Sequence, residues 1–292
     1  MANLRDIRRR ISSVKNTQQI TRAMKMVAAA KLRGAEDRLR MGRPYAIALD
    51  SLINDLYQRT EIEGFELLEG REEVKKVDYV LINSDRGLCG SFNAHLIRYL
   101  EPEVEQAKTK HEQVTLTIIG RKALDYFKRR DVIIRKSYTN LLRDFDFDLA
   151  VDVGGELFSA FDNGEVDEFR LVYNEFVSAV SQRIVTRRLI PVDLPEEPPP
   201  SGLDAKVDYV FEPSKEAILE GLLNRQVNYQ LYRSFLESFA AEMGARMSAM
   251  DSATNNAGEM IDVLTLKYNR ARQDAITSEL MEIINGAEAL KG

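Results

Sequence analysis

The chain is poor in the residues that support metal and redox chemistry. Its 292 residues include one cysteine, Cys89, and two histidines, His95 and His111. One cysteine excludes an intramolecular disulfide and a multi-cysteine zinc site, and two histidines are too few for most metal clusters. We therefore expect neither a metal site nor a redox cofactor in this chain.

Long apolar runs are missing as well. No run approaches the roughly 18 apolar residues that cross a bilayer, and the N-terminal residues Asn3–Ile7 (NLRDI) lack the hydrophobic core of a signal peptide. We expect a soluble protein that is not exported.

Proline is absent from residues 214–290, where apolar residues recur at helical spacing. Between Met250 and Ala275 the steps alternate between three and four residues, which is the period of a coiled-coil seam. A single helix over this range would be about 115 Å long, at about 1.5 Å per residue, and could not bury its apolar stripe alone. The sequence therefore predicts a partner helix of comparable length.

The predicted partner is a helix over residues 1–59. Its first apolar residues follow the same seam spacing: Leu4, Ile7, Ile11 and Val14. Pro44 is expected to kink or interrupt this helix, because proline lacks the N–H that the helix needs. Small residues gather in both arms, at 28–30 and 240–245, and favour a slim antiparallel pair.

Polar residues interrupt both seams, at Asn16–Gln19 (NTQQ) and at Asp251–Asn256 (DSATNN). An antiparallel arrangement can align the two interruptions. Polar residues in such a seam either fix the register of the two helices or contact something other than the partner helix.

Between the arms, over residues 75–195, apolar runs of strand length alternate with helical patterns. Two of these runs are Val77–Asn83 (VDYVLIN) and Thr115–Gly120 (TLTIIG). Such strands are typical of a mainly parallel sheet with helices on both faces. Further strands are expected within residues 131–138, 168–180 and 184–194, followed by a proline-rich linker at 196–213. The predicted fold is α/β: a long antiparallel coiled coil of the N- and C-terminal helices plus a central Rossmann-like α/β domain.

The segment Arg86–Ser91 (RGLCGS) follows a predicted strand and opens a helix, where α/β folds often bind phosphate. It has neither the G-x-G-x-x-G spacing nor the G-x-x-x-x-G-K-[ST] pattern. We favour a structural turn. A reactive Cys89 thiolate is the less favoured alternative, and it requires an exposed side chain.

Positive charge is concentrated near the N-terminus. Residues 1–43 hold twelve Lys or Arg against three Asp or Glu, whereas the whole chain has a net charge of −5. Clustered basic residues are typical of nucleic-acid binding. These residues, however, lie on several faces of the predicted helix with no aromatic residue among them, so we favour an acidic protein partner or a solvated face and expect no nucleic acid.

Residues 268–282 (YNRARQDAITSELME) carry polar side chains around the whole predicted helix, beyond the reach of the first arm. The apolar end at residues 283–290 then has no partner within the chain. A free apolar tip implies a partner protein.

Three separated blocks resemble the gamma subunits of bacterial F-type ATP synthases. They are Asp6–Lys31, which includes ISSVKNTQQITRAMKMVAAAK, the turn Ser84–Asn93 (SDRGLCGSFN), and the block Glu242–Gly286. The resemblance covers the whole chain in the family's order.

This resemblance implies a rotary shaft without catalytic residues. Its paired helices would turn inside a ring of three alpha and three beta subunits, with the central domain beside the epsilon subunit on the c-ring. Membrane association would be peripheral, through the complex only, at the cytoplasmic face of the bacterial inner membrane. The resemblance implies contact with the moving ends of the beta subunits at Met24, Lys25, Arg246, Arg272, Gln273, Thr277 and Glu279.

Two other classes remain open. One is a static coiled-coil adaptor between two assemblies. The other is an α/β enzyme with a coiled-coil appendage, which predicts affinity of the isolated chain for a small molecule; the lack of a convergent His, Cys or Lys constellation counts against it.

Overall fold

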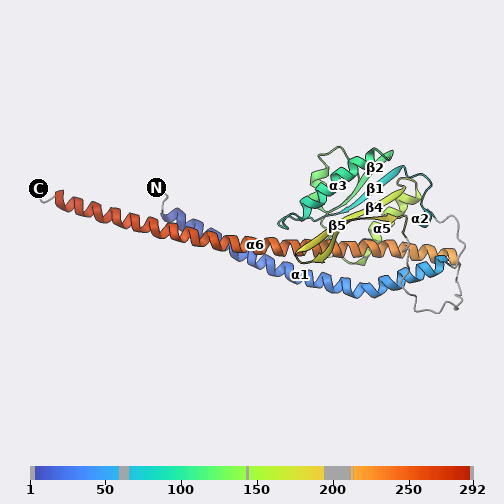
Figure 1. Cartoon of the computed structure of the whole chain (residues 1–292), viewed down its shortest axis with the longest axis horizontal. Helices are drawn as coiled ribbons and strands as arrows, with labels where there is room; N and C mark the ends of the chain where they lie inside the picture. The colour runs from blue at the N-terminus through green and yellow to red at the C-terminus, as the bar shows by residue number, and fades with distance from the viewer. Residues whose placement is uncertain (1–3, 59–65, 143–144, 194–211, 213, 290–292) are drawn as a thin grey trace. The chain divides into compact units, whose positions relative to one another are not determined.

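The computed structural model describes residues 4–58, 66–142, 145–193, 212 and 214–289 (Figure 1). Its contacts divide the chain into two units: residues 1–28 with 246–292, here the helical unit, and residues 29–245, here the sheet unit. Two helices contribute residues to both units: α1 (Leu4–Gln58) and α6 (Lys215–Ala289). No helix in the described part of the chain is both long enough and apolar enough to cross a membrane. Apart from Glu212, the predicted linker at 196–213 lies outside the described residues.

The sheet unit holds a five-stranded sheet in the order β3-β2-β1-β4-β5. The strands are β1 (Lys76–Ile82), β2 (Gln113–Ile119), β3 (Ile133–Tyr138), β4 (Glu168–Ser178) and β5 (Ser181–Ile190). The first four pair in parallel, whereas β5 returns antiparallel to β4. The order β3-β2-β1-β4 is that of doubly wound folds, so the predicted, mainly parallel α/β sheet is confirmed.

Helices cover both faces of this sheet. On one face, α3 (Phe92–Lys108) and α4 (Arg121–Phe127) pack on Tyr79 and Leu81 of β1. On the other face, α5 (Phe147–Asp162) and the sheet-unit parts of α1 and α6 pack on Val80 and Ile82. The short α2 (Glu66–Glu69) adds Leu68 to this second core. Covering both faces buries every β1 residue after Lys76, which explains the continuous apolar run in the sequence.

Within the sheet unit, α1 and α6 run antiparallel. The Tyr229 hydroxyl donates to the carbonyl oxygen of Gly42 (2.7 Å), and Gln226 Nε2 donates to Asp50 Oδ1 (2.5 Å). Of the two outcomes expected at Pro44, the interruption is wrong, since α1 continues through it, whereas the kink stays a prediction. Leu39 before the proline and Leu49 after it pack on the same core, and this packing outweighs the one backbone hydrogen bond that proline removes.

Candidate functional site

The helical unit is an antiparallel pair of α1 and α6 joined by polar contacts. Lys25 Nζ lies 2.5 Å from Asp251 Oδ1, and the hydroxyl oxygens of Thr21 and Thr254 are 2.8 Å apart. Gln18 Nε2 donates to the carbonyl oxygen of Thr254 at 3.3 Å. Residue numbers fall along α1 as they rise along α6, which confirms the antiparallel prediction. The polar interruptions of the two seams therefore face each other.

Both helices show the predicted seam spacing in the burial of their side chains. The buried or half-buried seam positions of α1 are Leu4, Ile7, Ile11, Val14, Gln18 and Thr21, and those of α6 are Met250, Thr254, Ala257, Ile261, Leu264, Tyr268, Ala271 and Ala275. Apart from Gln18, Thr21 and Thr254, these positions hold Tyr268 and purely apolar residues. The pair is thus closed along most of its length by non-directional apolar contact.

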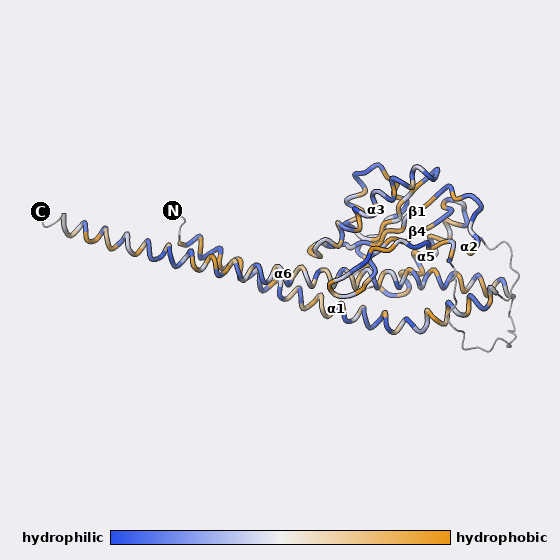
Figure 2. The backbone as a smooth tube through the Cα atoms, in the orientation of Figure 1, coloured by the Kyte–Doolittle hydropathy of each residue, from blue (hydrophilic) through white to orange (hydrophobic). Residues whose placement is uncertain are grey.

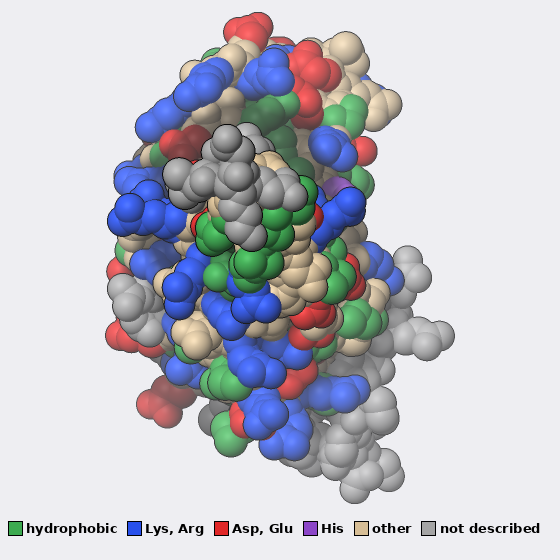
Figure 3. All heavy atoms as spheres, turned by 90° about the vertical axis from the view of Figure 1, so that its left-hand side faces the viewer, with side chains coloured by type: hydrophobic (Ala, Val, Ile, Leu, Met, Phe, Trp, Pro, Cys, Tyr) green, Lys and Arg blue, Asp and Glu red, His purple; other side chains and the backbone are tan. Residues whose placement is uncertain are grey.

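Beyond Ala275 the α6 helix presents a free end. Every described side chain from Ile276 to Ala287 is exposed. Five large apolar side chains in this segment are between 50% and 67% exposed: Ile276, Leu280, Met281, Ile283 and Ile284. The helical period puts most of them on one face and places Ser278, Glu279 and Glu282 away from it. Figure 2 shows hydrophobic and hydrophilic residues alternating along this end, and Figure 3 shows hydrophobic side chains on it.

The residues predicted to contact a partner fall into two groups. Met24 and Arg246 are half-buried, and Lys25 is paired with Asp251. Arg272, Gln273, Thr277 and Glu279 are exposed on α6, where the Thr277 hydroxyl donates to the carbonyl oxygen of Gln273 (2.9 Å). From Asp251 to Gln273 the helix rises about 30 Å. The structure therefore does not bring the two groups together, and the intrachain partner of Lys25 was not predicted.

Further exposed apolar side chains of the helical unit were missed by the sequence analysis. They are Ile20, Met26 and Val27 on α1 and Met260, Val263 and Leu266 on α6, each more than half exposed. All six fall between the seam positions, and this offset from the seam spacing is the signal that identifies them. Apolar side chains exposed in such number indicate a protein partner.

The turn at Arg86–Ser91 is held by the side chains of Ser84 and Asn93, which flank it. The Ser84 hydroxyl lies 2.7 Å from the carbonyl oxygen of Arg86 and 2.8 Å from Asn93 Oδ1, and Asn93 Nδ2 donates to Cys89 Sγ (3.2 Å). Cys89 is buried against Phe92 and Ala241. The expected structural turn agrees with these contacts, whereas the exposed thiol that a reactive cysteine requires is not found.

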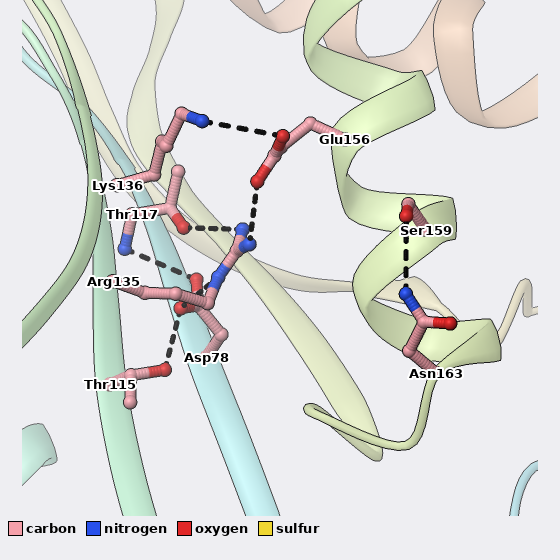
Figure 4. A network of polar contacts seen from close by, with 8 residues as sticks. All are labelled: Asp78, Thr115, Thr117, Arg135, Lys136, Glu156, Ser159 and Asn163. Carbon is pink, nitrogen blue, oxygen red and sulfur yellow. Dashed lines mark hydrogen bonds and ion pairs between the residues drawn. The ribbon is translucent and has the colours of Figure 1, made fainter.

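A buried charged cluster in the sheet unit was not predicted (Figure 4). Asp78 of β1 is fully buried and accepts hydrogen bonds from Arg135 Nε (3.1 Å) and from the Thr115 hydroxyl (2.6 Å). The other two guanidinium nitrogens of Arg135 donate to Glu156 (3.3 Å) and to the Thr117 hydroxyl (2.8 Å). Each nitrogen of the guanidinium thus has a partner in the chain, and the cluster ties β3 to β1, β2 and α5. It resembles no catalytic arrangement.

A cavity of about 230 Å³ in the sheet unit is lined by charged and polar groups from α1, β4, β5 and α6. Three of its charged residues are in ion pairs: Arg187 with Glu175, Asp193 with Arg188, and Arg233 with Glu237. The fourth, Asp50, accepts a hydrogen bond from Gln226. Burial raises the pKa of Tyr173, which lines the cavity, to about 12, so this phenol stays protonated at neutral pH. Among the described residues no group of three or more His, Cys, Asp and Glu side chains could hold a metal ion. The enzyme alternative gains no support from this cavity.

Comparison with known proteins gives a consistent assignment. The family model described as ATP synthase matches residues 3–290. The ATP synthase gamma chain of Syntrophobacter fumaroxidans is 45% identical over 292 residues, which is all of both chains. A chain of the Tetrahymena thermophila mitochondrial ATP synthase central stalk and c-ring structure is 25% identical, with a TM-score of 0.60 over 80% of this chain and 99% of that one. A chain of the Euglena gracilis mitochondrial ATP synthase structure has the same fold, with a TM-score of 0.68 at 22% identity over 98% and 94% of the two chains.

Proposed function

Because this chain belongs to the ATP synthase gamma-chain family, we propose that it is the central rotary shaft of that complex and has no catalytic residue of its own. Its helical unit turns inside a ring of three alpha and three beta subunits. Its sheet unit binds the epsilon subunit and the c-ring. Proton- or sodium-driven rotation of the c-ring is thereby coupled to ATP synthesis, and the reverse rotation to ATP hydrolysis. The complex holds the chain peripherally, at the cytoplasmic face of the bacterial inner membrane.

The free end of α6 is the observation that carries this proposal. Five large apolar side chains between Ile276 and Ile284 are at least half exposed, and no described residue of α1 covers them. In an isolated monomer these exposed apolar side chains would lower the solubility, whereas a surrounding ring of subunits buries them. Apolar contact is non-directional, so a helix can turn within an apolar sleeve with few directional bonds to break.

The mechanism follows from the asymmetry of the helical pair. A ligand or partner shifts a conformational equilibrium only as far as it interacts differently with the two states. The pair presents a different face in each direction, because its polar and apolar side chains are unevenly distributed around it. Inside a threefold ring each beta subunit meets a different face, and rotation exchanges these differences among the three sites.

We assign the contact with the beta subunits to Met24, Lys25, Arg246, Arg272, Gln273, Thr277 and Glu279. The exposure of the last four supports this proposal directly. Lys25 also has to exchange its contact with Asp251 for one with the ring, or make both contacts at once. The domain boundaries proposed from the sequence, 1–59, 75–195, 196–213 and 214–290, remain proposals.

The test is rotation during ATP hydrolysis. Purified alpha and beta subunits are assembled with this chain, and a bead is attached to the sheet unit through an exposed cysteine introduced as Lys128→Cys in a Cys89→Ser background. Sustained rotation in one direction supports the shaft. Binding and activation without rotation supports the static adaptor instead, and absence of binding contradicts both.

A further inference from the structure

One layer of the helical unit differs from the rest of the seam. This polar layer consists of Gln18, Thr21 and Lys25 on α1 and Asp251, Thr254 and Gly258 on α6. Its contacts are the two hydroxyls at 2.8 Å, the Gln18 amide on the Thr254 carbonyl at 3.3 Å, and the Lys25–Asp251 pair at 2.5 Å. Thr21 is buried although it is polar. Apolar residues and Tyr268 occupy the seam positions on either side.

The composition of the polar layer lowers the stability of the pair. A glycine inside a helix costs about 1 kcal/mol relative to alanine, and threonine is also a weak helix former. Polar residues at seam positions reduce coiled-coil stability compared with apolar ones and are used to specify one arrangement. The layer is therefore explained better by specificity than by stability.

Gly258 provides independent support for this interpretation. A Cβ atom at this position would lie 3.1 Å from Gln18 Nε2, closer than ordinary van der Waals contact. The missing side chain thus makes room for Gln18 to reach across the seam to the Thr254 carbonyl. Gly258 lowers the helix propensity of α6, and it stands where the Gln18 side chain of α1 needs room.

The hydrogen bonds of the layer are directional. Each threonine hydroxyl has one proton, and the Thr254 hydroxyl lies 2.7 Å from the Met250 carbonyl while the Thr21 hydroxyl lies 3.1 Å from the Gln18 carbonyl. When Thr254 donates to Met250, it accepts the proton of Thr21, so the two hydroxyls form a chain from α1 to the α6 backbone. Such a chain resists rotation of one helix against the other, whereas the apolar layers resist it only by shape.

We propose that the polar layer is a rotational clamp, in which Gln18, Thr21 and Thr254 are positioning residues that fix the orientation of α6 about its own axis against α1. From Ile276 onward the described side chains of α6 are exposed, so contact with α1 does not orient them. The clamp therefore sets the orientation of the α6 side chains at 272–279. The inference rests on the proposed function for its effect on rotation, but the clamp itself is a property of the pair.

The clamp is tested in the full chain assembled with the alpha and beta subunits. Spin labels on Arg8→Cys and Lys267→Cys, exposed positions near each other in the antiparallel register, report the distance distribution between the helices in a Cys89→Ser background. In Thr21→Val with Thr254→Val we expect this distribution to widen about twofold, with no loss in thermal stability. Thr21→Ser with Thr254→Ser keeps both hydroxyls and should keep the narrow distribution. Ile11→Val with Ile261→Val, in the apolar layers, is the matched packing control.

The same variants are then followed by the angular variance of a bead on Lys128→Cys between rotational steps. The valine pair should about double this variance, and the serine pair should leave it unchanged. A narrow distance distribution in the valine pair, or equal widening in the serine pair, overturns the clamp. A widened distribution with unchanged bead variance overturns the positioning role. If the unsubstituted chain does not rotate, the proposed function is contradicted, while the distance measurement still decides whether the clamp exists.

Discussion

Gly154 of α5 lies directly against the Asn228 side chain of α6. A Cβ atom at Gly154 would lie 1.9 Å from Asn228 Oδ1, so nothing larger than glycine fits unless the Asn228 side chain or the backbone moves. Glycine at this position therefore leaves room for the Asn228 side chain between α5 and α6.

Gly154→Ala should destabilise the sheet unit by about 1–3 kcal/mol, because the methyl group overpacks the contact between α5 and α6. The next residue is the matched control: a Cβ at Gly155 would meet nothing within 4 Å. Gly155→Ala should be neutral or stabilising by up to about 1 kcal/mol, through helix propensity alone. Urea unfolding of the two variants measures the difference, and equal effects would contradict the close contact.

Removing Arg135 should be among the most damaging single changes in the sheet. Arg135→Met leaves the fully buried carboxylate of Asp78 without its cation, which costs about 3–5 kcal/mol. The double variant Asp78→Asn with Arg135→Met removes both charges and should be less destabilised than Arg135→Met alone. Arg40→Met, which breaks an exposed pair with Asp37, is the control and should change stability by less than about 1 kcal/mol. A double variant worse than Arg135→Met would show that the charge of Asp78 is not the cause.

Asp167 should contribute to the loss of stability in acid. Burial alone would raise the pKa of its carboxyl, but the N–H of Lys76, the Arg71 guanidinium and the N–H of Lys75 together hold that pKa below its ordinary value of 3.8. The ionised carboxylate thus stabilises the folded state fully above the unfolded pKa, and this contribution is lost as the pH falls through the lower folded value. In Asp167→Asn the unfolding free energy should depend less on pH below about pH 4 than in the unsubstituted chain. Parallel pH profiles for the two proteins would exclude this role.

Arg272→Ala with Gln273→Ala should lower ATP turnover of the reconstituted complex about three- to tenfold, which corresponds to a loss of about 0.7–1.4 kcal/mol in the contact with the ring. Both side chains are exposed, so the melting temperature of the isolated chain should not change. Lys128→Ala with Arg129→Ala, an exposed basic pair in the sheet unit, is the control. Turnover equal to that of the control would remove both residues from the proposed contact set.

The sequence predicted those features that one repeating pattern determines. The β1 and β2 strands follow from apolar runs buried on both faces, and the facing of Gln18 and Thr254 follows from two polar interruptions in one antiparallel seam. Neither inference needs knowledge of distant parts of the chain.

Features that depend on a specific distant neighbour were missed. Asp78 is visible as a lone carboxylate within an apolar strand, but nothing local indicates that Arg135 pairs with it. The burial of Cys89 depends on Ala241 of α6, which is more than 150 residues away along the chain. The continuation of α1 through Pro44 depends on packing against the sheet core, which outweighs local helix preference.

The pairing of α1 with α6 also has a consequence for biosynthesis. Lys25 and Asp251 are 226 residues apart in sequence, so at about 5–20 residues per second the apolar seam of α1 waits roughly 10–45 s for its partner during translation. The strands of the sheet unit are complete before α6 begins. The α1 helix is therefore synthesised first but is among the last elements to pack. During that interval its apolar seam is exposed to chaperones and to aggregation.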